Sequence, residues 1–206
     1  DLEVLNNAKA VINLSGAGVG DKRWSDKYKT LILKSRVDST TTIVNAIKSL
    51  SDKPKVLLNA SAIGFYGERG SEEVDENSHR GTGFLSDVVQ AWEDSALALQ
   101  SSGVRVVLMR TGLVFTYRGG ALAKLLPIFK LGIGGKLGSG KQYWSFISLE
   151  DEIRAIKFLL EKDLSGPVNL TAPNPATNLE VTKALGKALK RPTIFAVPAI
   201  ALKIVL

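Results

Sequence analysis

The sequence predicts an α/β fold in which helices cover a parallel sheet, and three features of its pattern support this. Short apolar runs alternate with segments whose apolar residues recur at helical spacing. The runs are continuously apolar, as is typical of strands buried on both faces of a parallel sheet. One of them lies in Lys55–Gly67, KVLLNASAIGFYG, and opens into small residues at its carboxyl end. Open α/β sheets bind their ligands at that edge.

Length and composition predict one globular domain, with room for a smaller lobe. The chain has 206 residues, of which 45% are hydrophobic and 23% charged, so it can build a sizeable core. There is no cysteine, which excludes disulfides and thiolate metal sites and fits an intracellular protein, either cytoplasmic or in an organelle stroma or matrix. Any Ser-His-Asp triad would have to use His79, the single histidine, which we expect in a solvated loop.

The net charge of +7 raises the question of an anionic partner. The densest basic stretch, residues 21–36, mixes its cations with apolar residues and aspartates, as on the solvated face of a helix. We therefore do not predict nucleic-acid binding, whereas an acidic membrane surface or an acidic protein stays open as a partner. The apolar final stretch is too short to span a bilayer and contains Pro198, so it predicts a helix packed on the core.

The first half of the chain gives strand, helix, strand. Ala10–Leu14 is a buried strand that ends in SGAGVG, a glycine-rich turn. A helix is expected from Ser25 to Ser51, with Ser25-Asp26 as its amino-terminal cap. Lys55–Asn59 is the second strand. The expected apolar face of the helix consists of Tyr28, Leu31, Ile32, Ser35, Val37, Ile43, Val44 and Ile47.

The middle of the chain repeats this order. After a polar loop over Glu68–Gly83, an amphipathic helix is expected over Phe84–Gln100. Val104–Met109 is the third strand and leads into Arg110-Thr111-Gly112. Short apolar strands that alternate with helices predict a parallel sheet with crossover helices. The apolar stripe of this helix is Phe84, Leu85, Val88, Val89, Trp92, Ala96 and Leu99.

The last third contains three helices and two strands. A short helix over Ala121–Leu131 precedes a glycine-rich stretch, and Gln142–Ile147 is expected to form one aromatic strand. The helix Glu150–Glu161 should turn Ile153, Ile156, Phe158 and Leu159 inward. Gly166–Leu170 is a strand, and Asn178–Leu189 is a helix capped by Thr177 or Asn178.

The amino-acid sequences of several of these segments resemble those of the extended short-chain dehydrogenase/reductase superfamily. Within it, the chain looks like the NAD(P)-dependent, epimerase-like family of the SulA or YfcH type, a nucleoside-diphosphate-sugar epimerase family. The resemblance covers essentially the whole chain. It is carried by NLSGAGV at 13–19, RWSDKYKTLILKSRV at 23–37, NASAIGFYG at 59–67, DEN at 75–77, FLSDVVQAWE at 84–93, RTGLVF at 110–115, GGALAKLLPIFKLGIGGKLGSGKQYWSFI at 119–147, TAPNP at 171–175 and RPTIFAVPAIALK at 191–203.

The resemblance implies a Rossmann-type, doubly wound parallel sheet with a small C-terminal substrate lobe. The Rossmann core would be residues 1–115, and residues 116–206 would add further strands and the helices of the substrate lobe. The chain begins where the family's fourth strand would be, without the first βαβ units and their glycine-rich turn. The sheet should therefore present an open apolar edge, and the natural protein is expected to be longer.

The resemblance also implies a nicotinamide dinucleotide, NADP(H) more than NAD(H). The backbone of Leu14, Ser15 and Gly16 should approach the adenosine ribose and phosphates. Ala60 and Ser61 should face the nicotinamide ribose, and Thr111 and Gly112 the nicotinamide itself. Each of these residues has a structural alternative as an ordinary turn at a strand end.

The superfamily's catalytic pair, Tyr-x-x-x-Lys, is replaced in this chain. When the helix is aligned on Glu93, the two positions fall on Leu85 and Val89, and a shift by one residue gives Phe84 and Val88; in neither register can the pair transfer protons. Three candidates for catalysis remain. They are Ser61, Tyr66 and Arg36, the last at the position of a supporting Asn.

Three hypotheses about function follow. In the first, the protein is an oxidoreductase or epimerase for a small carbonyl or nucleotide-sugar substrate, with Tyr66 or Ser61 as proton relay and Arg36 as positive charge. In the second, it binds the dinucleotide without turnover, as a scaffold or regulatory subunit. In the third, it binds no cofactor. Candidates for substrate contact are Arg23, Trp24, Tyr143 and Trp144, of which Arg23 and Trp24 could instead form a surface cation–π pair.

Overall fold

The structure is a computed structural model that describes residues 5–195, and it divides into two compact units. Unit 1 comprises Asp1–Thr111 and Ile153–Leu170, and unit 2 comprises Gly112–Glu152 and Thr171–Leu206. The domain boundary expected between residues 115 and 116 stays a prediction. The expected helix over the apolar final stretch falls mostly outside the described residues. None of the helices between residues 5 and 195 is both long enough and apolar enough to span a bilayer.

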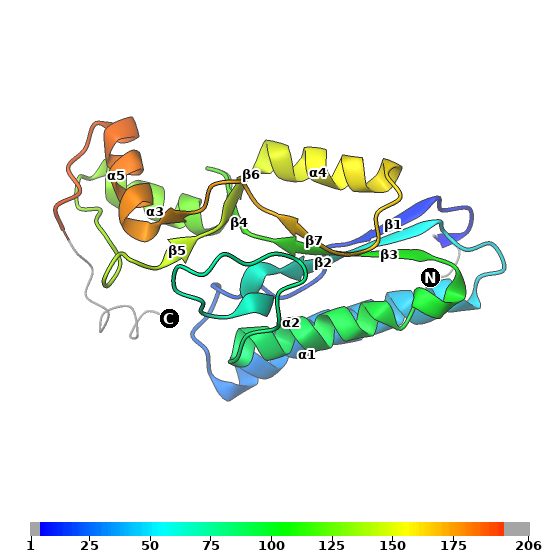
Figure 1. The fold of residues 1–206 in the computed structure, drawn as a ribbon. Helices are drawn as coiled ribbons and strands as arrows, with labels where there is room; N and C mark the ends of the chain where they lie inside the picture. The colour runs from blue at the N-terminus through cyan, green and yellow to red at the C-terminus, as the bar shows by residue number, and fades with distance from the viewer. Residues whose placement is uncertain (1–4, 196–206) are drawn as a thin grey trace. The chain divides into compact units, whose positions relative to one another are not determined.

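Unit 1 contains the predicted parallel sheet. Its strands are β1 (Ala10–Asn13), β2 (Val56–Ala62), β3 (Arg105–Thr111) and β7 (Gly166–Leu170), in the order β1-β2-β3-β7. All three pairings are parallel (Figure 1). β2 is therefore an interior strand, as the apolar run in KVLLNASAIGFYG indicated, and it continues three residues beyond the predicted end.

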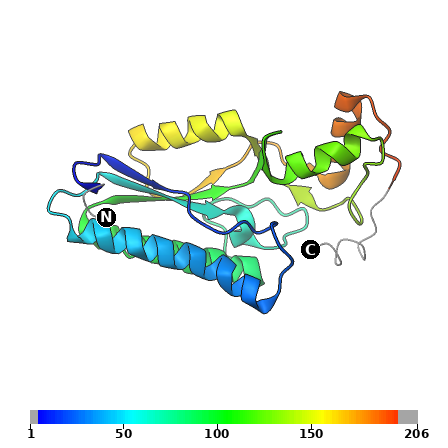
Figure 2. The ribbon, with the colours of Figure 1, turned by 180° about the vertical axis from the view of Figure 1, so that it is seen from behind.

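Helices cover both faces of this sheet. α1 (Asp26–Ser49) and α2 (Phe84–Leu97) lie side by side on one face (Figures 1 and 2). The part of α4 (Leu149–Glu161) that belongs to unit 1 lies on the other face. The predicted doubly wound α/β fold is confirmed.

The edge formed by β1 is open among the described residues. Among the described residues β1 pairs with β2 alone, and its Ile12 side chain is 43% exposed. Exposed backbone donors and acceptors on an edge strand can pair with a further strand.

α1 begins as predicted, but its buried face differs from the expected one. The Ser25 hydroxyl caps the helix by accepting a hydrogen bond from the Tyr28 amide. The buried stripe follows spacings of four residues and includes polar Thr40, with half-buried Arg36 on the same row. Leu31, expected to face inward, is half-exposed, so that assignment was wrong. The pattern of apolar residues could not predict this face, because the face also includes the polar side chains of Thr40 and Arg36.

α2 packs its predicted stripe on the sheet and on α1. Its carboxyl end is followed by a short 3₁₀ helix, Gln100–Ser102. Toward the amino ends of β2 and β3, the layer between the sheet and the two helices is a close-packed apolar cluster. It consists of Val44, Ile47, Leu57, Ala96, Leu99, Val104, Val106 and Leu108.

The inward face of α4 differs from the predicted one. Leu159 is buried and Ile156 is half-buried, but Ile153 and Phe158 are each 50% exposed, so those two assignments were wrong. Arg105 at the start of β3 fixes the carboxyl end of α4, because its guanidinium donates to the carbonyls of Leu159 (3.0 Å) and Leu164 (2.7 Å).

Unit 2 is built from short strands and two helices. Parallel β4 (Leu113–Phe115) and β6 (Phe146–Ser148) pair with each other, and antiparallel β5 (Tyr143–Trp144) pairs with β8 (Ala176–Thr177). α3 (Gly120–Lys130) packs on β4 and on α5 (Asn178–Leu189).

The single strand predicted over Gln142–Ile147 is therefore wrong, because the segment divides between two sheets. Ser145, at the division, uses its carbonyl to accept a hydrogen bond from the Leu113 amide (2.8 Å). Alternating aromatic residues predict extended backbone but cannot indicate which neighbour each half pairs with.

α5 begins at a capping box on Thr177, one of the two capping residues that the sequence predicted. The Thr177 hydroxyl accepts from the Glu180 amide, and the Glu180 carboxylate accepts from the Thr177 amide (2.7 Å) and hydroxyl (2.7 Å). These bonds lower the pKa of Glu180 below its ordinary value of 4.5.

We expect Thr177→Val to raise the pKa of Glu180 toward 4.5, as measured by carboxyl NMR over a pH titration. Because the folded-state pKa is depressed, the carboxylate stabilises the fold above its ordinary pKa, and this contribution is lost as the pH falls through the folded-state value. Glu180→Gln should make the stability of the protein less sensitive to pH in that acid range. An unchanged pKa in Thr177→Val would contradict the capping assignment.

Candidate functional site

The carboxyl ends of the four parallel strands lie along one edge of the sheet in unit 1. β1 ends at Asn13, β2 at Ala62, β3 at Thr111 and β7 at Leu170. Parallel sheets bind ligands beyond this edge, since the loops that follow the strands can open around a ligand. The buried polar groups of unit 1 are concentrated here, so this edge is the candidate site.

The turn after β1 is fixed by a buried amide network. The Asn13 side chain donates to the side chains of Asn59 (2.7 Å) and Thr40 (2.9 Å). Its Oδ1 atom accepts from the Ser15 backbone amide (3.1 Å). Trp92 on α2 donates to the same Thr40 hydroxyl (3.0 Å). The first residues after β1 therefore have a defined backbone path with no ligand present.

Arg36 of α1 holds the next residues of this turn. Its guanidinium donates to the carbonyls of Ala17 (3.0 Å) and Ile32 (2.9 Å) and lies 5.0 Å from the centre of the Trp92 ring. Burial lowers the pKa of this guanidinium. A Cβ atom at Gly16 would come 3.1 Å from the Arg36 side chain, so glycine permits the close packing. Arg36 thus joins α1 to the turn after β1.

The residues predicted to bind the cofactor differ in how far they are exposed to a ligand. Leu14, Ser15 and Gly16 are exposed, with Leu14 at 64%, and Ala60 is half-buried beside them at the edge. Small side chains on a fixed backbone allow close approach of a large, flat ligand. This part of the edge fits a dinucleotide.

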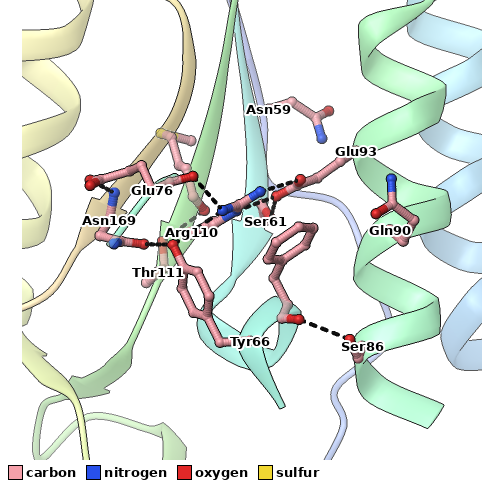
Figure 3. A network of polar contacts seen from close by, with 12 residues as sticks. Asn59, Ser61, Tyr66, Glu76, Ser86, Gln90, Glu93, Arg110, Thr111 and Asn169 are labelled. Atoms are coloured by element: carbon pink, nitrogen blue, oxygen red, sulfur yellow. Dashed lines mark hydrogen bonds and ion pairs between the residues drawn. The ribbon is translucent and has the colours of Figure 1, made fainter. Parts of the chain in front are cut away.

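Ser61 faces the layer between β2 and α2. Its hydroxyl donates a 2.5 Å hydrogen bond to the Glu93 carboxylate (Figure 3). The same carboxylate receives two hydrogen bonds of 2.8 Å from the Arg110 guanidinium. Glu93 is 3% exposed and Arg110 is 4% exposed, so this is a buried, bidentate ion pair.

Tyr66 extends the network toward β7. Its hydroxyl donates to the Asn169 side chain (2.7 Å) and accepts from Arg110 (3.1 Å) (Figure 3). The Asn169 backbone amide donates to the Glu76 carboxylate (2.8 Å). This bond joins the loop over residues 68–83 to the sheet. We call the set Ser61, Glu93, Arg110, Tyr66, Asn169 and Glu76 the Arg110 network.

Arg110 carries the charge at the centre of this network. Its guanidinium lies 3.5 Å from the centre of the Phe65 ring, a cation–π contact in addition to its hydrogen bonds. Burial alone lowers the pKa of Arg110, but the hydrogen bonds to Glu93 and Tyr66 and the charge of Glu93 outweigh it, and the net direction is upward. Arg110 therefore stays protonated and paired with Glu93.

These contacts occupy the hydroxyl protons of both catalytic candidates. The Ser61 proton is directed to Glu93, and the Tyr66 proton to Asn169. A Cβ atom at Gly64 would lie 3.6 Å from Leu85 and 3.7 Å from Val89, so aliphatic side chains border the end of β2. No proton donor stands at the two positions that the superfamily resemblance assigns to its catalytic pair.

The structure brings some of the predicted site residues together and separates others into different units. Trp24 donates to the Val19 carbonyl (2.8 Å) and packs edge-on against Phe84, while Arg23 is exposed. The cation–π pairs in the described part of unit 1 do not include Arg23 with Trp24.

The remaining predicted residues lie at the end of β3 and in unit 2. Thr111 ends β3 in unit 1. Tyr143, Trp144 and Gly112 belong to unit 2. A Cβ atom at Gly112 would come 2.6 Å from the Ser145 carbonyl, so a packing requirement within unit 2 explains this glycine.

Sequence reasoning missed the charged centre of the site. Glu93 was used only to align α2, and Arg110 only as part of a motif. A signal was present, because Glu93 lies on the apolar face of α2 and Arg110 near the end of an apolar strand. Charges of opposite sign at positions where burial is expected predict a pair.

We expect Glu93→Gln to lower the free energy of unfolding by about 3–5 kcal/mol, because it leaves the Arg110 charge buried without a counter-charge. The double variant Glu93→Leu/Arg110→Met should lose less than the sum of the single losses. Urea denaturation gives these values. As a matched control, Asp87→Asn breaks the exposed pair with Arg80 and should cost about 0–1 kcal/mol. Equal losses in Glu93→Gln and Asp87→Asn would contradict a central role for the buried pair.

Comparison with known proteins agrees with this geometry. A family model described as the NAD dependent epimerase/dehydratase family matches residues 2–171. An epimerase family protein of Mycobacterium bovis is 44% identical over 204 residues, which are 98% of this chain and 67% of that protein. The chain thus spans about two thirds of the length of this curated relative.

Two solved structures are similar across the whole chain. The human epimerase family protein SDR39U1 (isoform 2) with NADPH is 29% identical with a TM-score of 0.93, and the match covers 100% of this chain and 72% of that one. The nucleoside-diphosphate sugar epimerase from Corynebacterium glutamicum is 30% identical with a TM-score of 0.75, and the match covers 99% and 44% of the two chains.

Proposed function

The chain belongs to the NAD dependent epimerase/dehydratase family, and from this premise we propose that it binds a nicotinamide dinucleotide at the carboxyl edge of its sheet without the family's usual acid–base chemistry. The observation that carries the proposal is the Arg110 network. It directs the Ser61 proton to the buried Glu93 carboxylate and the Tyr66 proton to the half-buried Asn169 side chain, while Leu85 and Val89 replace the proton-transferring pair.

The residues that would hold the dinucleotide are those whose backbone is accessible. Leu14, Ser15 and Gly16 would meet its ribose and phosphates, and Ala60 would meet the ribose at the nicotinamide end. When bound, the dinucleotide supplies a carbon that can accept or donate hydride. Asn13 and Arg36 keep the backbone of this turn in place.

The contacts of the three catalytic candidates support a positioning role for each of them. Ser61 orients Glu93, Tyr66 connects β3 with β7 through Arg110 and Asn169, and Arg36 holds the turn after β1. A catalytic acid or base must come within hydrogen-bond reach of a substrate atom, whereas the contacts of these three residues are to other groups of the protein. These three residues therefore act as positioning residues, which favours cofactor binding over turnover.

NADP(H) is the proposed cofactor, in keeping with the human relative whose structure contains NADPH. If the protein has a substrate, a nucleotide sugar or a small carbonyl compound is the proposed class, since the bacterial structural relative is described as a nucleoside-diphosphate sugar epimerase. Its place in the cell, cytoplasmic or in an organelle, stays a prediction.

We expect the full-length protein to bind NADPH more tightly than NADH in calorimetric titration. With bound NADPH, a panel of carbonyl compounds and nucleotide sugars should produce no oxidation that depends on Tyr66 or Ser61. Trp92 lies beneath Arg36, so quenching of tryptophan fluorescence gives a second measure of binding. Lys27→Gln, on the exposed side of α1, is the matched control for Arg36→Gln, which should weaken binding by loosening the turn.

Two results would overturn the proposal. Absence of any dinucleotide binding would remove the function itself. Turnover that Tyr66→Phe abolishes, with NADPH affinity and folding unchanged, would show that Tyr66 transfers a proton, and the protein would then be an acid–base enzyme.

A further inference from the structure

The positive charge of the chain is concentrated in unit 2. Unit 1 carries 17 of the Lys and Arg residues against 16 acidic residues and is nearly neutral. Unit 2 carries the other 10 against only 4 acidic residues. The net charge of +7 is thus almost wholly a property of unit 2, a separation that the even spread of cations along the sequence conceals.

Within unit 2, basic residues lie at the carboxyl ends of both α3 and α5. Arg191, just beyond α5, donates from Nε to the carbonyl of Lys130 at the end of α3 (2.9 Å). A Cβ atom at Gly132 would lie 3.6 Å from Pro192, so the segment after α5 runs against the loop after α3. The acidic residues of unit 2 lie elsewhere, at Glu150–Glu152 and at Glu180 in the first turn of α5.

Exposed aliphatic side chains occur in the same two chain segments as these cations. Leu131 and Ile133 follow Lys130, and they are 74% and 51% exposed. Ile194, three residues after Arg191, is 80% exposed. Large apolar side chains grouped on a surface indicate contact with something apolar. We call this group the α3–α5 surface, and it consists of Lys130, Leu131, Ile133, Lys187, Lys190, Arg191 and Ile194.

We propose that the α3–α5 surface docks the protein on an anionic lipid bilayer. The cations would meet the lipid headgroups, and the aliphatic side chains would enter the boundary between headgroups and acyl chains. A surface that combines basic and aliphatic residues without acidic ones has the chemistry of peripheral membrane binding. Docking through unit 2 is independent of the dinucleotide site in unit 1.

The composition of the surface favours lipid over other polyanions. A nucleic acid would satisfy the cations and could stack on Phe195, which is 51% exposed, but it would leave Leu131, Ile133 and Ile194 without an apolar partner. A purely acidic polypeptide such as polyglutamate would likewise pair with the cations alone. A bilayer satisfies both kinds of side chain at once.

The test is flotation of the full-length protein with vesicles of phosphatidylcholine alone or mixed with phosphatidylglycerol. We expect binding to the anionic vesicles only, and weaker binding as salt is raised. Lys130→Gln/Lys187→Gln should weaken partition on the order of 30-fold, since each basic residue near such a surface contributes about 1 kcal/mol. Leu131→Ser/Ile194→Ser should weaken it about tenfold or more.

Lys27→Gln/Lys48→Gln on α1 is the matched control, because both side chains are exposed and the change in net charge is the same. Binding by this control at the level of the natural protein supports the proposal when circular dichroism shows all variants folded. Three results would overturn it: no binding to anionic vesicles at moderate salt, equal losses in the control and in the charge variant, or binding to polyglutamate or DNA without binding to vesicles.

Discussion

The ion pair between Glu93 and Arg110 is the interaction on which the carboxyl end of unit 1 depends. Removing two charges from water is costly, and the cost is recovered only where geometry is good and the remaining hydrogen-bonding groups are satisfied. Here the pair is bidentate, Ser61 bonds the carboxylate and Tyr66 bonds the guanidinium. The pair therefore joins α2 to β3 and draws in β2 and β7 through neutral side chains.

The polar and apolar parts of this unit divide along the strands. Toward the amino ends of β2 and β3, the sheet and the two long helices meet in an apolar cluster. Toward the carboxyl ends, two polar networks take over, one around Asn13 and Thr40 and the other around Arg110. Buried polar groups specify one arrangement but stabilise a fold less than apolar packing does. Their concentration at one edge is what a ligand site requires, because the backbone there must keep its path before the ligand arrives.

Patterns in the sequence predicted the parallel sheet, the helices over its two faces and the caps at Ser25 and Thr177. These features depend on neighbours along the chain. Burial of Leu31, Ile153 and Phe158 was predicted wrongly, since it depends on what each helix packs against. Ser61 and Tyr66 form hydrogen bonds with partners 32 and 103 residues away, which residue spacing cannot indicate. The resemblance to a family indicated which edge of the sheet holds the candidate site. It did not indicate which groups the Ser61 and Tyr66 hydroxyls bind.

The position of the dinucleotide is tested most directly by hydrogen–deuterium exchange in the full-length protein with and without NADPH. The account predicts that NADPH slows exchange at the backbone amides of residues 14–16 and 60–61. The amides at the start of β3, at the opposite end of the sheet, should be unaffected and serve as the internal reference. Binding of NADPH that leaves residues 14–16 and 60–61 unprotected would contradict the central claim.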